Sequence, residues 1–253
     1  MPGGLNPARA RPVRGFVPRP GTVLDPQAWP DRVPAVRRLL TTGLDLPAGV
    51  TFLVGANGAG KSTLVEAMAG ALGAHVEGGT GDHHAGPDRG RRTDRSTLAD
   101  RLQVVRGPGG RRETFFLRAE TMHRFYDYLE ESDREAVNKV GYQYHYRSHG
   151  EGFLDLLTGQ YVARAAVVLL DEPESALSFE NCLVAARALA DLAARGKQVV
   201  CATHSPVLTA LPGARILEVD ERGLTPTTWE DLRLVHDWRF FLDAPERYLG
   251  DVP

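Results

Sequence analysis

The residues with the clearest chemical meaning are the eight from Gly55 to Ser62, which read GANGAGKS. They match the pattern G-x-x-x-x-G-K-[ST], in which a glycine-rich backbone wraps around the phosphates of a nucleotide. The lysine of this pattern contacts the β- and γ-phosphates, and the hydroxyl that follows it contacts Mg²⁺. The pattern predicts a site for a nucleoside triphosphate. We expect the binding residues to be Gly55, Ala56, Asn57, Gly58, Ala59, Gly60, Lys61, Ser62 and Thr63.

Two adjacent carboxylates form the second candidate group. Asp171 and Glu172 follow an apolar run that begins at Val167. In parallel sheets, ligands bind outside the carboxyl ends of the strands. We therefore expect Asp171 and Ser62 to hold the metal ion between them. Glu172 is placed to accept a proton from the water that attacks the γ-phosphorus, so we predict that it is the general base.

Two further polar groups follow the same logic. His204 comes directly after the apolar run from Gln198 to Thr203, where it would reach the γ-phosphate or the attacking water. Ser148 opens the sequence SHGEG, in which a hydroxyl and glycine N–H groups at a helix start would bind an anion. An ordinary capping box, with Glu151 three residues after Ser148, explains that segment equally well.

The elements that must position these groups alternate along the chain. Strand-like Val50–Val54 enters the glycine-rich loop, and helical periodicity follows Lys61. Apolar strands over residues 165–170 and 198–203 enclose a helix that we predict from Phe179 to Ala194. Strands alternating with helices, two of them apolar throughout, predict an α/β fold whose parallel-cored sheet is covered on both faces. Residues 102–106 and 113–117 flank a Gly-Pro-Gly-Gly turn, which predicts a hairpin.

Length and composition limit the number of domains, the kinds of binding partner and the cellular location that we expect. A length of 253 residues suits one large domain, and the formal charge of −2 gives no general attraction to nucleic acid or membranes. Two cysteines cannot form a disulfide framework, and the chain has no apolar run of about 18 residues. We therefore expect a cytoplasmic protein without membrane insertion. Residues 1–30 are rich in Pro, Gly and Arg and predict an extended arm; residues 31–253 form the catalytic domain.

Other segments allow a functional interpretation but favour an ordinary one. Arginines at 89, 91, 92 and 95 form a basic run that would suit nucleic acid but is more typical of a solvated loop. His83 and His84 lack the neighbours expected of metal ligands. Tyrosines alternate at 142, 144 and 146, a pattern that suits base stacking but more often reflects packing.

The motifs as a set resemble the ATP-binding-cassette (ABC) class of ATPases: GANGAGKST, SHGEG, VVLLDEPESALS and ATHSP occur in its order. The chain is more closely similar to small AAA-family "predicted ATPases" with an S-H-G-E signature and a hairpin ending in F-L-R-A-E, here Phe116–Glu120. This resemblance implies a P-loop NTPase fold of the ABC-ATPase type, with a mixed sheet and a small helical subdomain over about 118–160.

The resemblance also implies a mechanism. Two subunits would sandwich two ATP molecules with Mg²⁺, so that Ser148, Gly150 and Glu151 of one contact the phosphate held by Lys61 of the other. Catalysis would depend on Glu172, His204 and Lys61. ATP would join the homodimer and hydrolysis would release it.

Several positions depart from the pattern of that class. Its usual metal-contacting Gln is missing, and Arg118, Glu120 or Gln103 would have to replace it. Ser178 stands where an Asp usually follows SAL, and SHGEG replaces SGGQ. The aromatic side chain that would stack on adenine is Trp29 or Phe16, although packing is the commoner role for both.

Three functions are compatible with the sequence. The first is a soluble ABC-type ATPase that hydrolyses ATP to act on an unknown target, with nucleic acid or a protein as its partner. The second is the ATP-binding subunit of an ABC transporter, which would require a Gln-containing coupling loop. The third is a small-molecule kinase, which would not explain SHGEG or His204.

Overall fold

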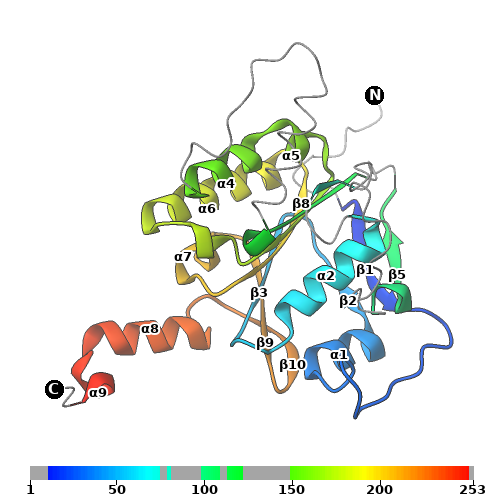
Figure 1. Cartoon of the computed structure of the whole chain (residues 1–253), viewed down its shortest axis with the longest axis horizontal. Coiled ribbons are helices and arrows are strands. Elements are labelled where there is room, and N and C mark those ends of the chain that lie inside the picture. Colours follow the sequence, from blue (N-terminus) through cyan, green and yellow to red (C-terminus); the bar gives the residue numbers. More distant parts are fainter. Residues whose placement is uncertain (1–10, 75–78, 81–97, 109–112, 122–148, 251–253) are drawn as a thin grey trace.

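A computed structural model describes residues 11–74, 79–80, 98–108, 113–121 and 149–250, which form two sheets and the helices around them (Figure 1). The larger sheet has seven strands in the order β10-β9-β3-β8-β7-β6-β4. Its central five strands are parallel, and β10 and β4 pair antiparallel at the two edges. The predicted α/β class with a mixed, parallel-cored sheet is confirmed. The strands are β3 (Val50–Val54), β4 (Gly79–Thr80), β6 (Thr114–Arg118), β7 (Val167–Asp171), β8 (Gln198–Thr203), β9 (Arg215–Asp220) and β10 (Gly223–Thr227).

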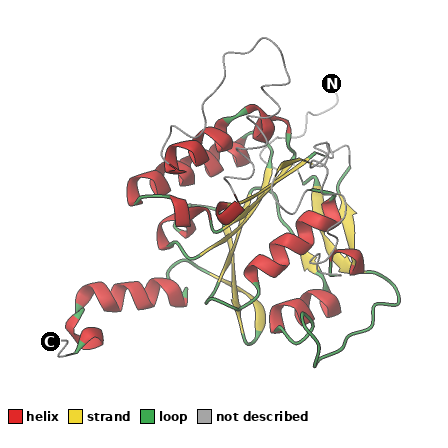
Figure 2. Cartoon of the chain, viewed as in Figure 1, coloured by secondary structure: helices red, strands yellow, loops and turns green. Residues whose placement is uncertain are grey.

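Helices cover both faces of this sheet, as Figure 2 shows. Every residue of β3, β7 and β8 is buried, which explains why these strands are apolar throughout instead of alternating. Alternate strand residues enter two separate cores, so that Phe52 packs with α4 and α6 while Leu53 packs with α1 and α2. The helices are α1 (Pro34–Thr42), α2 (Lys61–Leu72), α4 (His149–Thr158), α5 (Gln160–Arg164), α6 (Phe179–Ala194), α7 (Pro206–Thr209), α8 (Arg233–Asp243) and α9 (Glu246–Leu249).

Short 3₁₀ turns and a projecting pair of helices complete the described chain. The turns are η2 (Ala99–Arg101), η3 (Ala119–Thr121) and η5 (Pro173–Ala176). Helices α8 and α9 extend away from the sheet at the C-terminal end (Figure 1). Among the described residues, no helix combines the length and the apolar character needed to cross a bilayer. Most of the predicted helical subdomain lies outside the described residues, because 122–148 are not among them.

The smaller sheet corrects part of the sequence interpretation. It is antiparallel, in the order β2 (Leu44–Asp45), β1 (Val13–Pro18), β5 (Leu102–Arg106). Part of the predicted irregular arm is therefore a strand, because Val13 and Phe16 bury their side chains completely even though Gly and Pro residues interrupt the pattern. The predicted hairpin is wrong: β5 pairs with β1, and β6 pairs in parallel with β7 in the other sheet.

The buried amide of Gln198 joins the two sheets. Its Oε1 accepts a hydrogen bond from the Val13 N–H at 3.0 Å, and its Nε2 donates to the Val13 carbonyl at 2.8 Å and the Pro47 carbonyl at 2.7 Å. One side chain thus satisfies buried backbone groups of Val13 on β1 and a half-buried carbonyl in the turn before β3.

We expect Gln198→Ala to lower the free energy of unfolding by about 2–3 kcal/mol, because it leaves buried backbone groups without partners. Thermal unfolding, followed by circular dichroism, should show a melting temperature lower by about 5 °C. The matched control is Gln103→Ala, since Gln103 is exposed on β5. Equal losses in the two variants would contradict a bridging role for Gln198.

Candidate functional site

The glycine-rich loop joins β3 to α2, and two of its glycines are required by the backbone. A Cβ on Gly55 would lie 2.1 Å from the carbonyl oxygen of Val219 on β9, so a side chain does not fit there. Gly60 has φ +101°, a left-handed conformation that other residues rarely adopt. The loop can therefore turn tightly against β9 and enter α2 at Lys61.

The N-terminus of α2 is open to an anion. Gly60 is its N-cap and provides no side-chain acceptor for the first N–H groups, and the first turn carries no acidic residue. Those N–H groups and the positive end of the helix dipole therefore remain available to a ligand. This arrangement is what a phosphate group needs.

Lys61 places a buried ammonium beside the loop. Its side chain is 3% exposed, and its Nζ lies 3.3 Å from the Ala56 carbonyl oxygen, 2.6 Å from His204 Nε2 and 3.8 Å from Glu172 Oε1. Burial lowers the pKa of Lys61, and the negative charges of Glu172, Asp171 and Glu174 act in the opposite direction.

His204 lies between the lysine and the carboxylate. Its Nε2 is 3.2 Å from Glu172 Oε1 and 2.6 Å from Lys61 Nζ. One ring nitrogen cannot accept a hydrogen bond from Lys61 Nζ and donate one to Glu172 Oε1 at the same time. The histidine tautomer therefore decides whether Nε2 accepts a hydrogen bond from Lys61 or donates one to Glu172. The strand order explains the contact, since β8, which ends at Thr203, lies between β3 and β7.

Asp171 ends β7 beside the first hydroxyl of α2. Its Oδ1 accepts a hydrogen bond from Ser62 Oγ at 3.0 Å, and its Oδ2 accepts one from Arg118 Nε at 2.9 Å. Burial raises the pKa of Asp171, although Arg118 and Ser62 oppose that shift. A hydroxyl and a carboxylate next to the glycine-rich loop are hard oxygen donors that fit Mg²⁺.

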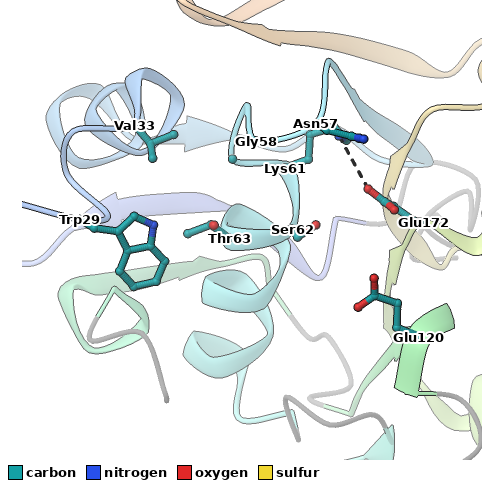
Figure 3. Close-up of a pocket in the computed structure, with 10 residues that line it drawn as sticks. Trp29, Val33, Asn57, Gly58, Lys61, Ser62, Thr63, Glu120 and Glu172 are labelled. Carbon is teal, nitrogen blue, oxygen red and sulfur yellow. Dashed lines mark ion pairs between the residues drawn. The ribbon is translucent and has the colours of Figure 1, made fainter. Parts of the chain in front are cut away.

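Glu172 has an unusual backbone. Its φ of +49° makes it the one non-glycine residue with positive φ in the described part of the chain. Its N–H donates to the Ala202 carbonyl at 2.9 Å, which holds the turn against β8. Such a conformation costs about 1–3 kcal/mol and is concentrated at functional sites. The turn directs the carboxylate across the cavity toward Lys61, as Figure 3 shows.

Glu174 lies behind this turn and binds the backbone of His204. The sequence analysis did not predict a role for Glu174. One of its oxygens accepts a hydrogen bond from the backbone N–H of His204, while Oε2 is buried without a partner among the described residues. Burial raises the pKa of Glu174, and the bonds from His204 and Thr203 oppose the shift. The acidic run that starts at Asp171 was the available signal, but its third carboxylate turns inward.

Lys61, Ser62 and Glu172 line a cavity of about 400 Å³ (Figure 3). Trp29 and Val33 lie at one end of it, Glu120 and Glu172 lie at the other, and the start of α2 lies between them. This volume is within the usual range for small-molecule sites. The lining residues are Trp29, Val33, Asn57, Gly58, Gly60, Lys61, Ser62, Thr63, Glu120 and Glu172.

The structure distinguishes between the residues that the sequence offered for two roles, the aromatic that stacks on adenine and the replacement for the missing Gln. Phe16 is fully buried in the core that contains α1 and α2, so it is not the base-stacking aromatic, whereas Trp29 lines the cavity and is 58% exposed. Gln103 is exposed on β5 of the smaller sheet, so it does not replace the missing Gln. Arg118 contacts Asp171, and Glu120 lines the cavity.

Most of the other candidate residues from the sequence lie outside the described part of the chain. Ser148 lies outside the described residues, as do His83, His84, the arginine run over 89–95 and the tyrosines over 142–146. Gly150 and Glu151 belong to α4, but the structure describes only their backbone. Their contact with a nucleotide stays a prediction.

Two family models match the chain, and each of them contains some of the residues of this site. Residues 38–121 match a model described as "AAA domain", and residues 144–210 match one described as "AAA domain, putative AbiEii toxin, Type IV TA system". The first contains the glycine-rich loop and Arg118, and the second contains both carboxylates and His204. Both are models of AAA domains, and neither covers half of the chain.

Individual relatives are distant from this chain. It is 28% identical over 207 residues to the "Putative ribose/galactose/methyl galactoside import ATP-binding protein 1" of Rhizobium etli. That match covers 73% of the chain but spans only 39% of the curated relative's length.

Solved structures align over most of the chain. One is cbiO1 of Clostridium perfringens, part of the ABC transporter complex cbiONQ, with 15% identity, a TM-score of 0.47, and 81% and 88% of the two chains covered. Another is the SMC head domain of Thermotoga maritima, with 14% identity, a TM-score of 0.42, and 74% and 92% covered.

The raised pKa of Glu174 predicts a pH-dependent stability. A carboxyl group whose folded pKa lies above its ordinary value of 4.5 binds its proton more tightly in the folded state, so stability falls as pH rises from 4.5 through the raised pKa. Glu174→Gln cannot ionise and should lack this loss. Its melting temperature relative to wild type should therefore increase between about pH 5 and pH 8.

The control for this comparison is Glu230→Gln, because Glu230 is exposed. Its melting temperature should follow that of wild type across the same pH range. If the Glu174→Gln difference were constant with pH, ionisation of the buried carboxyl would not contribute to stability.

Proposed function

We propose that this protein binds ATP with Mg²⁺ in the cavity at the start of α2 and hydrolyses it in a nucleotide-bound homodimer. The observation that carries this proposal is that Lys61, Asp171, Glu172 and His204 come together from the ends of three neighbouring strands. Lys61 and Glu172 also line the cavity. These groups lie between residues 61 and 204 of the sequence, and they meet because the parallel strands end at the same edge of the sheet.

The triphosphate is assigned to the loop and the helix N-terminus. Backbone N–H groups over residues 55–63 surround the phosphates, and Lys61 contributes its ammonium. Lys61 must exchange its contact with His204 for a phosphate oxygen, which the low exposure of its side chain favours because water competes poorly there. Ser62 and Asp171 would hold Mg²⁺, which neutralises charge on the β- and γ-phosphate oxygens.

Glu172 and His204 are assigned to the attacking water. Glu172 lies at the end of the cavity near Lys61, with one third of its side chain exposed, so a water molecule can reach its carboxylate. Glu172 takes the proton of that water, and His204 hydrogen-bonds the γ-phosphate or the water itself. The shared contacts of His204 with Lys61 and Glu172 support a role that connects phosphate binding to the base.

The adenine base is assigned to Trp29. This side chain is more than half exposed and lies at the end of the cavity opposite Glu172, where a base would lie when its phosphates occupy the loop. An indole ring that faces solvent provides a flat surface for stacking.

The second subunit is assigned the role of closing the site. The cavity leaves Trp29 and Glu172 partly exposed, and hydrolysis is more efficient when bulk water is excluded. The resemblance to ABC ATPases suggests that Ser148, Gly150 and Glu151 of a second subunit cover the phosphates. ATP would then hold the two subunits together, and hydrolysis would separate them.

The target of this cycle is open to two proposals. The first is a cytoplasmic ATPase that acts on nucleic acid or on a protein. The second is the energy-supplying subunit of a transporter, which the name of the Rhizobium etli relative suggests. Hydrolysis measured with and without double-stranded DNA separates them, because stimulation that weakens with salt would favour a nucleic-acid partner.

We expect Glu172→Gln to retain ATP binding and to lower hydrolysis by at least a hundredfold, because an amide cannot accept the proton. With ATP and Mg²⁺, this variant should elute as a dimer in size-exclusion chromatography with light scattering, and without ATP as a monomer. Glu221→Gln, which changes an exposed carboxylate on the β9–β10 turn, is the control. Wild-type turnover in Glu172→Gln would rule out Glu172 as the general base.

Trp29→Ala should weaken ATP binding by roughly tenfold, since loss of base stacking costs about 1–3 kcal/mol. Trp29→Phe should restore most of the affinity because it keeps an aromatic face. Isothermal titration calorimetry measures both, with Trp238→Ala on α8 as a control for loss of a partly exposed indole. An unchanged affinity in Trp29→Ala would show that adenine binds elsewhere.

A further inference from the structure

The guanidinium of Arg118 occupies one side of the carboxylate assigned to the metal ion. Arg118 Nε donates to Asp171 Oδ2 at 2.9 Å, while Ser62 Oγ donates to Asp171 Oδ1 at 3.0 Å. Both oxygens of Asp171 therefore have a hydrogen-bond donor, and one of these donors carries a positive charge. The Asp171 side chain is only 3% exposed, so water screens this charge pair weakly.

A second acidic residue holds the other end of the same guanidinium. Arg118 Nη2 forms an ion pair with Glu66 Oε1 on α2. Glu66 is four residues after Ser62, one helical turn along the same face of α2, so it lies beside the Ser62–Asp171 pair. The guanidinium thus bridges a carboxylate inside the assigned metal site and a carboxylate next to it.

The fold determines this position. Arg118 is the last residue of β6, and the parallel register of β6 with β7 pairs it with Asp171. Burial acts to lower the pKa of Arg118, but Glu66 and Asp171 outweigh burial and raise it above its ordinary value. Its guanidinium is cationic at any working pH, as it is for arginine in proteins generally.

We propose that Arg118 is a resident cation that holds the place of the divalent ion on Asp171 in the nucleotide-free ATPase, and that Glu66 retains its guanidinium when the metal binds. This inference rests on the proposed function. It makes Arg118 a positioning residue with two opposite electrostatic effects: it attracts the phosphates of metal-free nucleotide, and it competes with the metal for Asp171.

The experiment measures two quantities for each variant by isothermal titration calorimetry with a non-hydrolysable ATP analogue. One is the dissociation constant in EDTA, and the other is the Mg²⁺ concentration that gives half of the metal-dependent gain in affinity. In Arg118→Gln we expect the dissociation constant in EDTA to rise about fivefold and the half-saturating Mg²⁺ concentration to fall about fivefold, because the fixed charge is lost.

Two matched variants test the mechanism further. Arg118→Lys keeps the charge and should bind the metal-free analogue within about twofold of wild type. Glu66→Gln keeps the size of the side chain but removes the second carboxylate, so the guanidinium should bind Asp171 more strongly. Its half-saturating Mg²⁺ concentration should therefore rise, in the direction opposite to that of Arg118→Gln. Melting temperatures identify any variant that fails to fold, and Glu66→Gln carries the test if Arg118→Gln does not fold.

The outcomes separate this inference from the function on which it rests. If Arg118→Gln weakens both metal-free and metal-dependent binding, Arg118 is only a structural brace and the inference is overturned. If it changes neither quantity, the inference is also overturned, while the nucleotide site remains. If the wild-type protein binds no nucleotide with or without Mg²⁺, the proposed function fails first.

Discussion

The structure of the site depends on the buried ammonium group of Lys61, which lies in the field of the nearby carboxylates of Glu172, Asp171 and Glu174. Removing a charge from water is costly unless other charges or hydrogen bonds compensate. Lys61 is compensated by the Ala56 carbonyl, by His204 at 2.6 Å and by Glu172 at 3.8 Å, while its burial still lowers its pKa. A polyanionic ligand would satisfy this group better than these neighbours do, so the electrostatics of the site suit a phosphate group.

The parallel register of the sheet determines which groups surround that ammonium. Strand β8 lies between β3 and β7, so His204 is placed between the glycine-rich loop and the turn that carries Glu172. The pairing of β6 with β7 brings Arg118 to Asp171 in the same way. Because alternate residues of these strands fill two apolar cores, a register shift would move side chains into the wrong core, and the site geometry is therefore held by the core of the protein.

Departures from the ABC pattern have identifiable structural consequences. Ser178, which replaces the usual Asp after SAL, is the N-cap of α6 and accepts a hydrogen bond from the Asn181 N–H at 3.2 Å. Arg118, in the region where the class carries a Gln, brings a permanent positive charge to Asp171 and Glu66. The proposed metal site of this protein thus contains a cation of its own, and its electrostatics differ from those of a site with a neutral amide.

The sequence by itself determined the phosphate loop, the strand-end carboxylates and His204, because each of these is a local pattern attached to an apolar strand. It also determined the α/β class, since buried parallel strands are apolar throughout. Only the tertiary structure decided that β5 pairs with β1, that Glu174 holds the His204 backbone, and that Trp29 and not Phe16 faces the cavity. It also decided that Arg118 contacts both Asp171 and Glu66. These features depend on the pairing of segments far apart in the chain, and hydrophobic periodicity within a segment carries no information about its partner.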